Sequence, residues 1–204
     1  TRGKFFLGDE EIEKIIQKAK EKSYDDFIVL STCNRPEIYG SGNHNMAVDL
    51  LMEVVGGNKT VFENHSIVKK DKHALQHIFH VATGLDSQIL GDYEILGQFK
   101  RACKISKSSE LLSPFFERLA NSTIQASKKV KTNTAISQGT VSVSYAAIEL
   151  IKEKYNDKKI NVLVLGTGKF GRTVSKNIQQ YLPNASITVA NRTDAKAKAF
   201  ANEF

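Results

Sequence analysis

The sequence predicts two units of different fold class, an α+β unit over residues 1–138 and a partial α/β unit over residues 139–204. In the first part, helical and strand patterns mix without a regular strand–helix–strand rhythm, which is typical of α+β folds. In the second part, a buried-strand pattern runs directly into a glycine-rich turn, a helix pattern and another strand pattern. That order is typical of an α/β unit.

Periodicity defines the elements of the first unit in order. Asp9 is a candidate N-cap for a helix whose apolar residues recur at i, i+3, i+4 and i+7, namely Ile12, Ile15, Ile16 and Ala19. The elements expected after it are a strand at 27–32, a helix that Gly56-Gly57 stops, a strand near 66–69, a helix that Asp71 opens, and helices near 92–108 and 114–133.

The second unit begins with a helix whose apolar residues include Val143 and Ile151. A polar break at 156–159 separates this helix from an apolar strand at 160–165. After the glycine-rich turn, Val174 and Ile178 indicate a helix, and residues 186–190 indicate a second strand. A complete nucleotide-binding domain needs more strands than this, so we expect the chain to be a fragment of a longer protein.

Composition narrows the class of protein. The chain has no run of 18 apolar residues and no signal-peptide pattern, and its two cysteines make no disulfide framework. We therefore expect a cytoplasmic, reducing environment. The 29 Lys and Arg residues exceed the 22 Asp and Glu residues by 7, which favours an anionic partner such as a nucleic acid or a nucleotide. Solvated helix faces would explain the same excess.

Cys33 is the candidate nucleophile of the chain. It follows the apolar run 27–30, so its thiol is expected at the end of a buried strand, where α/β proteins place ligand chemistry. Arg35 lies two residues away, and a nearby cation favours the reactive thiolate. The residue fits a small buried hydrophobe at a strand end equally well. Cys103, within a helical pattern, is expected in the core.

The segment 77–102 contains candidate groups for a polar substrate. Gly84, Gly91 and Gly97 interrupt its helical pattern at a cost in stability, and such breaks often let polar groups line a cavity. The candidate groups are Ser87, Asp92, Glu94 and Gln98, with His77 as an acid or base. His73, His77 and His80 are spaced so that they permit a metal. Surface histidines are the commoner case, so no metal is predicted.

The glycine fingerprint at 166–171 reads G-T-G-K-F-G and lies between a strand and a helix, which is the context that supports dinucleotide binding. Gly166 permits the tight turn, Gly168 lets the backbone approach a pyrophosphate, and Gly171 allows close helix–strand packing. NAD enzymes usually have an Asp or Glu about 20 residues after the fingerprint, and its carboxylate binds the ribose 2′-hydroxyl. Here Asn191-Arg192-Thr193 stands there, which favours NADP, although Asp194 is nearby.

Taken together, these motifs resemble one family. Residues 31–39, S-T-C-N-R-P-E-I-Y, resemble the catalytic signature of glutamyl-tRNA reductases. Residues 81–102 resemble that family's block V-A-S-G-L-D-S…L-G-E…I-L-G-Q, and residues 142–150 and 162–193 also fit, with N-R-T after the second strand. The match covers nearly the whole chain, and the combination is far more specific than any single motif.

The resemblance implies an NADP-dependent oxidoreductase. It would reduce glutamyl-tRNA(Glu) to glutamate-1-semialdehyde with NADPH, the first step of five-carbon tetrapyrrole (porphyrin) biosynthesis. Cys33 would attack the ester and hold a glutamyl thioester, and His77 would assist near it. The residues implied to contact the glutamyl group are Thr32, Cys33, Asn34, Arg35, Ser87, Asp92, Tyr93, Glu94 and Gln98. Those implied to contact NADPH are Gly166, Thr167, Gly168, Lys169, Phe170, Gly171, Asn191, Arg192 and Thr193.

The resemblance also implies domain roles and partners. Residues 1–138 would be the catalytic, glutamyl-tRNA-recognising domain, and residues 139–204 a truncated NADP-binding domain. The family's helical dimerisation domain would follow Phe204 and make the full-length protein a homodimer. Glutamate-1-semialdehyde aminomutase is a further implied partner.

Some positions depart from the family pattern. Pro36 replaces the usual Thr, and Asp92-Tyr93-Glu94 replaces the usual E-P-Q, so contacts there are expected to differ in detail. Two alternatives compete with this interpretation. Another NADP-dependent oxidoreductase, of the shikimate-dehydrogenase type, would explain residues 160–204 but leave Cys33 without a role. A non-catalytic tRNA-binding module would explain the charge but not the glycine fingerprint.

Overall fold

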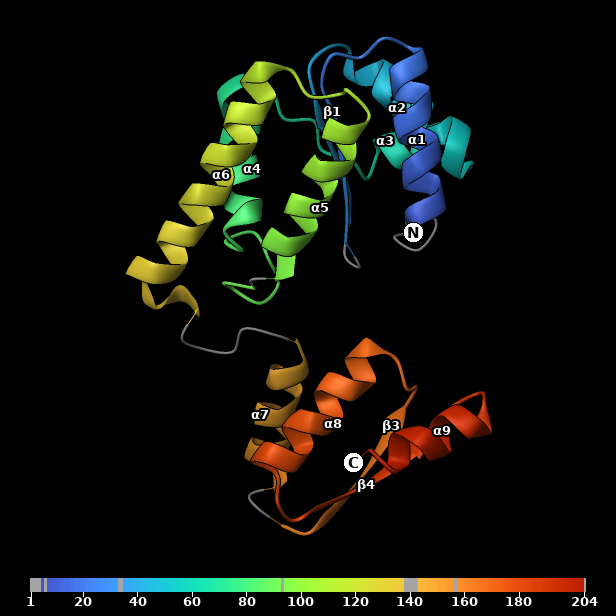
Figure 1. Cartoon of the computed structure of the whole chain (residues 1–204), viewed down its shortest axis with the longest axis vertical. Coiled ribbons are helices and arrows are strands. Elements are labelled where there is room, and N and C mark those ends of the chain that lie inside the picture. The colour runs from blue at the N-terminus through green and yellow to red at the C-terminus, as the bar shows by residue number, and fades with distance from the viewer. Residues whose placement is uncertain are drawn as a thin grey trace. The chain divides into compact units, whose positions relative to one another are not determined.

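The computed structural model describes residues 5, 7–32, 35–92, 94–137, 143–155 and 158–203. The chain forms two compact units, Thr1–Ser137 and Gln138–Phe204 (Figure 1). The first combines helices with an antiparallel sheet and the second is a parallel βαβ unit, so the predicted fold classes are confirmed. None of the helices in the described ranges is long and apolar enough to cross a membrane.

The first unit is organised around an antiparallel hairpin of β1 (Phe27–Ser31) and β2 (Pro36–Gly40). The register pairs Ile28 with Tyr39 and Leu30 with Glu37. The backbone N–H of Thr32 donates to the carbonyl of Arg35 at 3.1 Å, directly beyond the last strand pair. The strand pattern at 27–32 is confirmed, but its partner β2 was not predicted, because Pro36 and Glu37 are poor strand formers.

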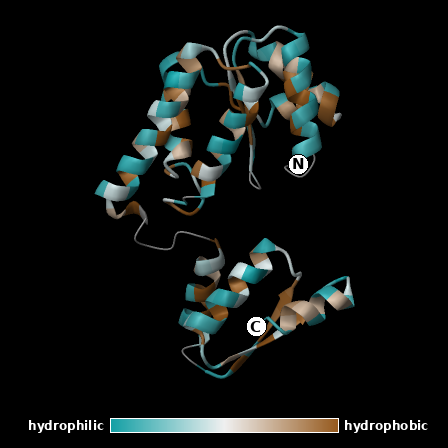
Figure 2. Cartoon of the chain, viewed as in Figure 1, coloured by the Kyte–Doolittle hydropathy of each residue, from teal (hydrophilic) through white to brown (hydrophobic). Residues whose placement is uncertain are grey.

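Each face of the hairpin is covered by helices. Phe27 and Val29 belong to a core cluster with α1 (Asp9–Glu21) and α2 (His44–Val55). Ile28 and Leu30 belong to a second cluster, with α4 (Asp71–Ala82), α5 (Glu94–Ser108) and α6 (Pro114–Asn133). Successive side chains of a strand point to opposite faces, so a strand covered on both faces is continuously apolar. Figure 2 shows hydrophobic residues on the strands of the second unit and hydrophobic residues alternating with hydrophilic ones along the helices.

Two local predictions for the first unit are wrong. The first helix is capped by Gly8 rather than Asp9, because the carboxylate of Glu11 accepts the Gly8 N–H at 2.9 Å. No strand forms near 66–69: Ile67 there is 84% exposed. A strand needs a partner strand. In the described part of the chain each sheet consists of two strands, β1 with β2 and β3 with β4, and neither sheet pairs with residues 66–69. The short helix α3 (Lys59–Glu63) was not predicted.

The second unit runs α7 (Val143–Tyr155), β3 (Ile160–Leu165), α8 (Lys169–Tyr181), β4 (Ala185–Ala190) and α9 (Asp194–Ala201). β3 and β4 pair in parallel, with Ile160 opposite Ala185 and Leu165 opposite Ala190. Ile148, Val164 and Ile178 form the core between the helices and one face of the sheet. The predicted strand–helix–strand order is confirmed, and α9 was not predicted.

Two glycines between α4 and α6, Gly91 and Gly97, allow a test of where the backbone requires glycine. Gly91 has φ +81°, and a Cβ there would lie 2.3 Å from the carbonyl oxygen of Ile136. We predict that Gly91→Ala lowers the free energy of unfolding by about 2–4 kcal/mol, through left-handed strain and overpacking. Gly97 is the control: it lies within α5 with nothing near its Cβ position. Gly97→Ala should stabilise the helix by about 0.5–1 kcal/mol. Equal effects of the two changes in chemical denaturation would contradict this account.

Candidate active site

The candidate site is built on the alternation of β2. Glu37 and Tyr39 pair with Leu30 and Ile28, whose side chains join the core cluster on the α4 side of the hairpin. Glu37 and Tyr39 therefore share that side, and Arg35 precedes them with the same period of two. The side chain of Glu37 is only 11% exposed. A carboxylate is thus held at the edge of an apolar core and requires donors around it.

Two side chains donate to Glu37, and a third lies close to it. The Arg35 Nε–H donates to one carboxylate oxygen, and the Tyr39 hydroxyl donates to the other. The Nε2 atom of His77, on α4, lies 3.3 Å from that second oxygen. The Tyr39 and His77 rings are 6.3 Å apart between centroids. The network therefore orients the side chains of Arg35, Tyr39 and His77 around one largely buried acid.

Asp86, in the segment after α4, closes the network from the opposite side. Its Oδ2 atom lies 2.5 Å from Nη2 of Arg35 and 3.9 Å from Nδ1 of His77. Its backbone carbonyl is 3.4 Å from both terminal nitrogens of Arg35. Arg35 is therefore held between two carboxylates, and His77 lies near both of them.

The surroundings determine the charge state of two members of this network. Burial raises the pKa of Tyr39 above its usual range, and the negative charge of Glu37 adds to the effect. Burial alone would lower the pKa of Arg35, but the hydrogen bond to Glu37 and the charges of Glu37 and Asp86 outweigh it, so the pKa is raised. Tyr39 thus remains a neutral donor and Arg35 a cation at neutral pH.

The structure brings together two of the residues predicted from sequence, Arg35 and His77. Thr32 supports them: its hydroxyl donates to the Arg35 carbonyl at 2.9 Å and accepts the Arg35 N–H at 3.1 Å. This arrangement closes the hairpin and sets the start of β2. The predicted residues Cys33, Asn34 and Tyr93 lie outside the described residues.

The remaining candidate substrate residues lie around the start of α5. Oδ1 of Asp92 accepts the Glu94 N–H at 3.0 Å, so this carboxylate serves the first turn of the helix. Asp92 also lines a hollow together with Gly97, Lys100 and Lys131. Gln98 is exposed one turn after Glu94, and Ser87 is half-buried next to Asp86.

Glu37, Tyr39 and Asp86 were not among the candidate residues predicted from sequence. A signal existed for the first two, because Arg35, Glu37 and Tyr39 alternate with Pro36 and Ile38 as polar residues do on one face of a strand. Alternation gives no signal for Asp86, which is 51 residues from Arg35, but Asp86 lies within the segment 81–102 that resembles the family block.

The same side chains could in principle hold a cation. One ligand atom each from Glu37, His77 and Asp86 lies within 4.8 Å of the others. Arg35 already pairs with both carboxylates, so a metal ion bound there would compete with its guanidinium for them. Of the histidines considered together in the sequence, only His77 joins the network, while His73 and His80 are exposed.

The glycine fingerprint connects β3 to α8. Gly166 has φ +101°, a backbone conformation that favours glycine, and its N–H donates to the Ala190 carbonyl at 2.8 Å. Gly168 is the N-cap of α8 and has open space where a Cβ would stand. A Cβ on Gly171 would lie 2.3 Å from the Gly166 oxygen, so the turn packs against the helix. This geometry fits a pyrophosphate at the helix N-terminus.

The residues after β4 lie at the same end of the sheet as the fingerprint, because parallel strands share their carboxyl ends. The Asn191 side-chain amide donates to the Thr193 carbonyl at 3.2 Å, and Thr193 is the N-cap of α9. The Arg192 side chain is exposed. Lys169 and Phe170 begin α8, so the residues predicted to bind a cofactor gather at one end of the unit.

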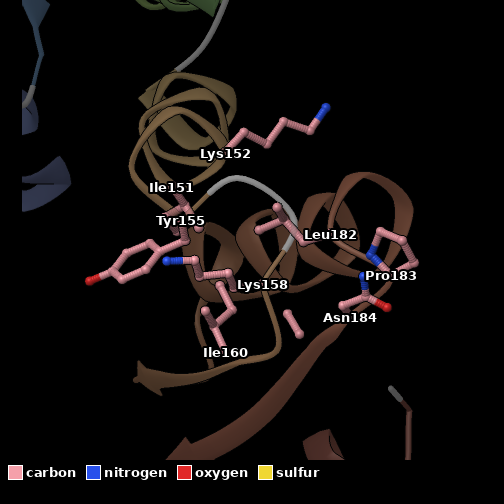
Figure 3. A pocket seen from close by; sticks show the side chains of 9 residues that line it. Ile151, Lys152, Tyr155, Lys158, Ile160, Leu182, Pro183 and Asn184 are labelled. Atoms are coloured by element: carbon pink, nitrogen blue, oxygen red, sulfur yellow. The ribbon is translucent and has the colours of Figure 1, made fainter.

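A small, shallow hollow marks the opposite end of this sheet. Ile160 and Ala185, the first residues of the two strands, line it together with Tyr155 and Lys158 (Figure 3). It is therefore separate from the glycine turn.

The α+β unit carries an ionic network on its hairpin, and the βαβ unit that follows carries a glycine fingerprint, an arrangement typical of two-domain proteins that bind a dinucleotide. The family model "Glutamyl-tRNAGlu reductase, N-terminal domain" matches residues 1–134, and the model "Shikimate / quinate 5-dehydrogenase" matches residues 149–204. The chain belongs to the glutamyl-tRNA reductase family, which confirms the resemblance found in the sequence.

Named relatives of this chain support its membership of the family. The chain is 46% identical over 206 residues to a protein of Christiangramia forsetii named glutamyl-tRNA reductase, covering 100% of this chain and 49% of the relative. A protein of Aquifex aeolicus with that name is 34% identical, covering 100% of this chain and 50% of the relative. The solved glutamyl-tRNA reductase of Methanopyrus kandleri matches with a TM-score of 0.59 and 28% identity, over 97% of this chain and 49% of that one. The chain thus spans about half the length of these relatives.

The role of Glu37 in the network is testable. Glu37→Gln keeps the shape of the side chain but removes the charge that pairs with Arg35. We predict a loss of about 1–3 kcal/mol in the free energy of unfolding, because hydrogen bonds to a charged group are weakened inside a partly buried site. The control is Glu63→Gln on α3, whose carboxylate is half exposed and 4.0 Å from Lys59; it should change stability by less than about 0.5 kcal/mol. Equal losses in urea denaturation would contradict a central role for Glu37.

Proposed function

We propose that the protein containing this chain reduces glutamyl-tRNA(Glu) to glutamate-1-semialdehyde with NADPH, through a thioester on Cys33. This is the first step of five-carbon tetrapyrrole (porphyrin) biosynthesis. Membership of the glutamyl-tRNA reductase family supports the proposal. The observation that carries it is the network of Arg35, Glu37 and His77, in which Arg35 follows Cys33 by two residues and His77 comes from α4. In this proposal, the network provides a cation and an acid or base for the thiol of Cys33.

The proposed chemistry divides a hard reduction into two steps. The Cys33 thiolate attacks the ester carbonyl, a carbon–sulfur bond forms, and the bond to the terminal ribose oxygen breaks. NADPH, when bound, would supply the hydride that reduces the thioester carbon. The thiolate then leaves, the aldehyde is released and Cys33 returns to its starting state.

His77 is proposed to give the departing ribose oxygen its proton. Its two ring nitrogens face Glu37 and Asp86, which fixes the orientation of the imidazole. Arg35 is proposed to hold the side-chain carboxylate of the glutamyl group through its terminal nitrogens. Thr32, Asn34, Ser87, Asp92, Tyr93, Glu94 and Gln98 complete the proposed substrate-binding residues.

NADPH is proposed as the cofactor of residues 139–204. Gly166, Thr167, Gly168, Lys169, Phe170 and Gly171 would hold its pyrophosphate, with Asn191, Arg192 and Thr193 at the 2′-phosphate. The open space at Gly168 and the exposed side chain of Arg192 support this assignment. An arginine pairs with a 2′-phosphate, whereas a carboxylate at that place would repel it.

The proposed partners follow the family. Residues 1–138 would be the catalytic domain that recognises tRNA, and the exposed side chains of Lys100, Lys104, Lys128 and Lys129 on α5 and α6 supply positive charge for it. A homodimer formed through a further helical domain, delivery of the aldehyde to glutamate-1-semialdehyde aminomutase, and a cytoplasmic location complete the proposal.

The thioester is tested with the two cysteines of the chain. Cys33→Ser should abolish formation of the semialdehyde in the full-length protein, because a hydroxyl is a far weaker nucleophile than a thiolate near neutral pH. Cys103→Ser is the control: burial raises the pKa of the Cys103 thiol to about 11, so this thiol stays protonated and activity should survive. Mass spectrometry should find a glutamyl adduct on Cys33 without NADPH. Turnover in Cys33→Ser at the wild-type rate would overturn the covalent mechanism.

Cofactor choice is tested at Arg192. Arg192→Ala should weaken NADPH binding by about 10- to 100-fold and leave NADH binding unchanged, since only the phosphate contact is lost. Lys196→Ala, exposed on α9, should alter neither. The measurement is fluorescence titration of the full-length protein with each nucleotide. Equal use of NADPH and NADH by the unmodified protein would refute the assignment.

A further inference from the structure

The guanidinium of Arg35 makes two ion pairs, a fixed one with Glu37 and an exchangeable one with Asp86. On the fixed side, Nε of Arg35 donates to Glu37, whose side chain is 11% exposed. On the other side, Nη2 lies 2.5 Å from Oδ2 of Asp86, whose side chain is 46% exposed. Ion pairs in contact with water contribute little to stability, so this pair opens at low cost, whereas the Glu37 pair does not.

The substrate carboxylate and Asp86 require the same donors. The carbonyl oxygen of Asp86 is 3.4 Å from Nη1 and Nη2, a long contact, so the short bond from Nη2 to Oδ2 is what occupies the terminal nitrogens. A second carboxylate cannot pair with both terminal nitrogens while Asp86 holds one of them. The Asp86 side chain must therefore turn away when a glutamyl group binds Arg35.

Only the side chain has to move. The backbone N–H of Asp86 donates to the His80 carbonyl at 3.3 Å, which anchors the residue to the end of α4. An aspartate carboxylate changes place by rotation about its χ1 angle. Once the Asp86 carboxylate has left Arg35, it needs another cation. His77 does not replace Arg35, because its Nδ1 atom is 3.9 Å away and its Nε2 atom lies next to Glu37. A glutamyl ester carries such a cation, its α-ammonium group, two methylene groups from its carboxylate.

We infer that Asp86 is a specificity-determining residue that exchanges its ion pair with the substrate. Arg35 takes the side-chain carboxylate of the glutamyl group, and Asp86 takes the α-ammonium group. One internal ion pair is replaced by two with a zwitterionic substrate, and the net charge of the site does not change. An acyl group that lacks either charge leaves one partner unpaired, which is how such a site discriminates. This inference rests on the proposed function.

The test compares two probes that cannot react. One is 3′-amino-3′-deoxyadenosine carrying glutamate through an amide, and the other carries glutaryl, which lacks only the α-ammonium group. In the full-length protein, removing the ammonium should weaken binding about 10- to 100-fold, as expected for a charged hydrogen bond. In Asp86→Asn, the same removal should cost less than about 3-fold, and the glutaryl probe should bind at least as tightly as to the unmodified protein.

Two further variants control the measurement. Asp86→Glu retains the carboxylate and should restore most of the ammonium preference. Asp25→Asn removes an exposed aspartate outside the network and should behave as the unmodified protein. An ammonium preference of equal size in the unmodified protein and in Asp86→Asn would overturn the role of Asp86 alone. Failure of the unmodified protein to prefer the glutamyl probe over a leucyl analogue would overturn the proposed function as well.

Discussion

The antiparallel pairing of β1 with β2 is the constraint on which the rest of the first unit depends. Because Leu30 lies opposite Glu37 and Ile28 opposite Tyr39, the register decides which side chains of β2 face α4. A slip by one residue would turn Glu37 toward the cluster of α1 and α2, where Phe27 and Val29 pack. Both faces of β1 pack into apolar clusters. A slip of β2 in either direction would therefore bury its polar side chains without hydrogen-bond partners, and this cost holds the register.

Glu37 shows how a charged group is kept at the edge of a core. A lone buried carboxylate would be strongly unfavourable, but Arg35, Tyr39 and His77 all direct polar atoms at it. The consequence extends beyond stability. The acid fixes one edge of the guanidinium and leaves the other edge to Asp86 and to solvent, so a structural interaction and an exchangeable one share a single arginine.

In the second unit, the glycines of the turn are required for different reasons: some by close packing or backbone conformation, and one where the space around it is open. Gly171 is required because a side chain there would strike the Gly166 carbonyl, and Gly166 is required by its own backbone conformation. Gly168 meets nothing within 4 Å, so protein packing does not explain it. A glycine that the protein's own packing does not require is consistent with the close approach of a ligand to the backbone.

Periodicity in the sequence determined much of this protein. The helix that Asp71 opens is α4, the helical pattern at 114–133 is α6, and the glycine fingerprint lies in the βαβ unit, because each of these signals depends on neighbouring residues alone. The β-pattern near 66–69 misled, since a strand exists only when another strand accepts its hydrogen bonds. The partnership of Arg35 with Asp86 was decided by tertiary structure, because the packing of α4 against the hairpin brings together residues that lie 51 positions apart.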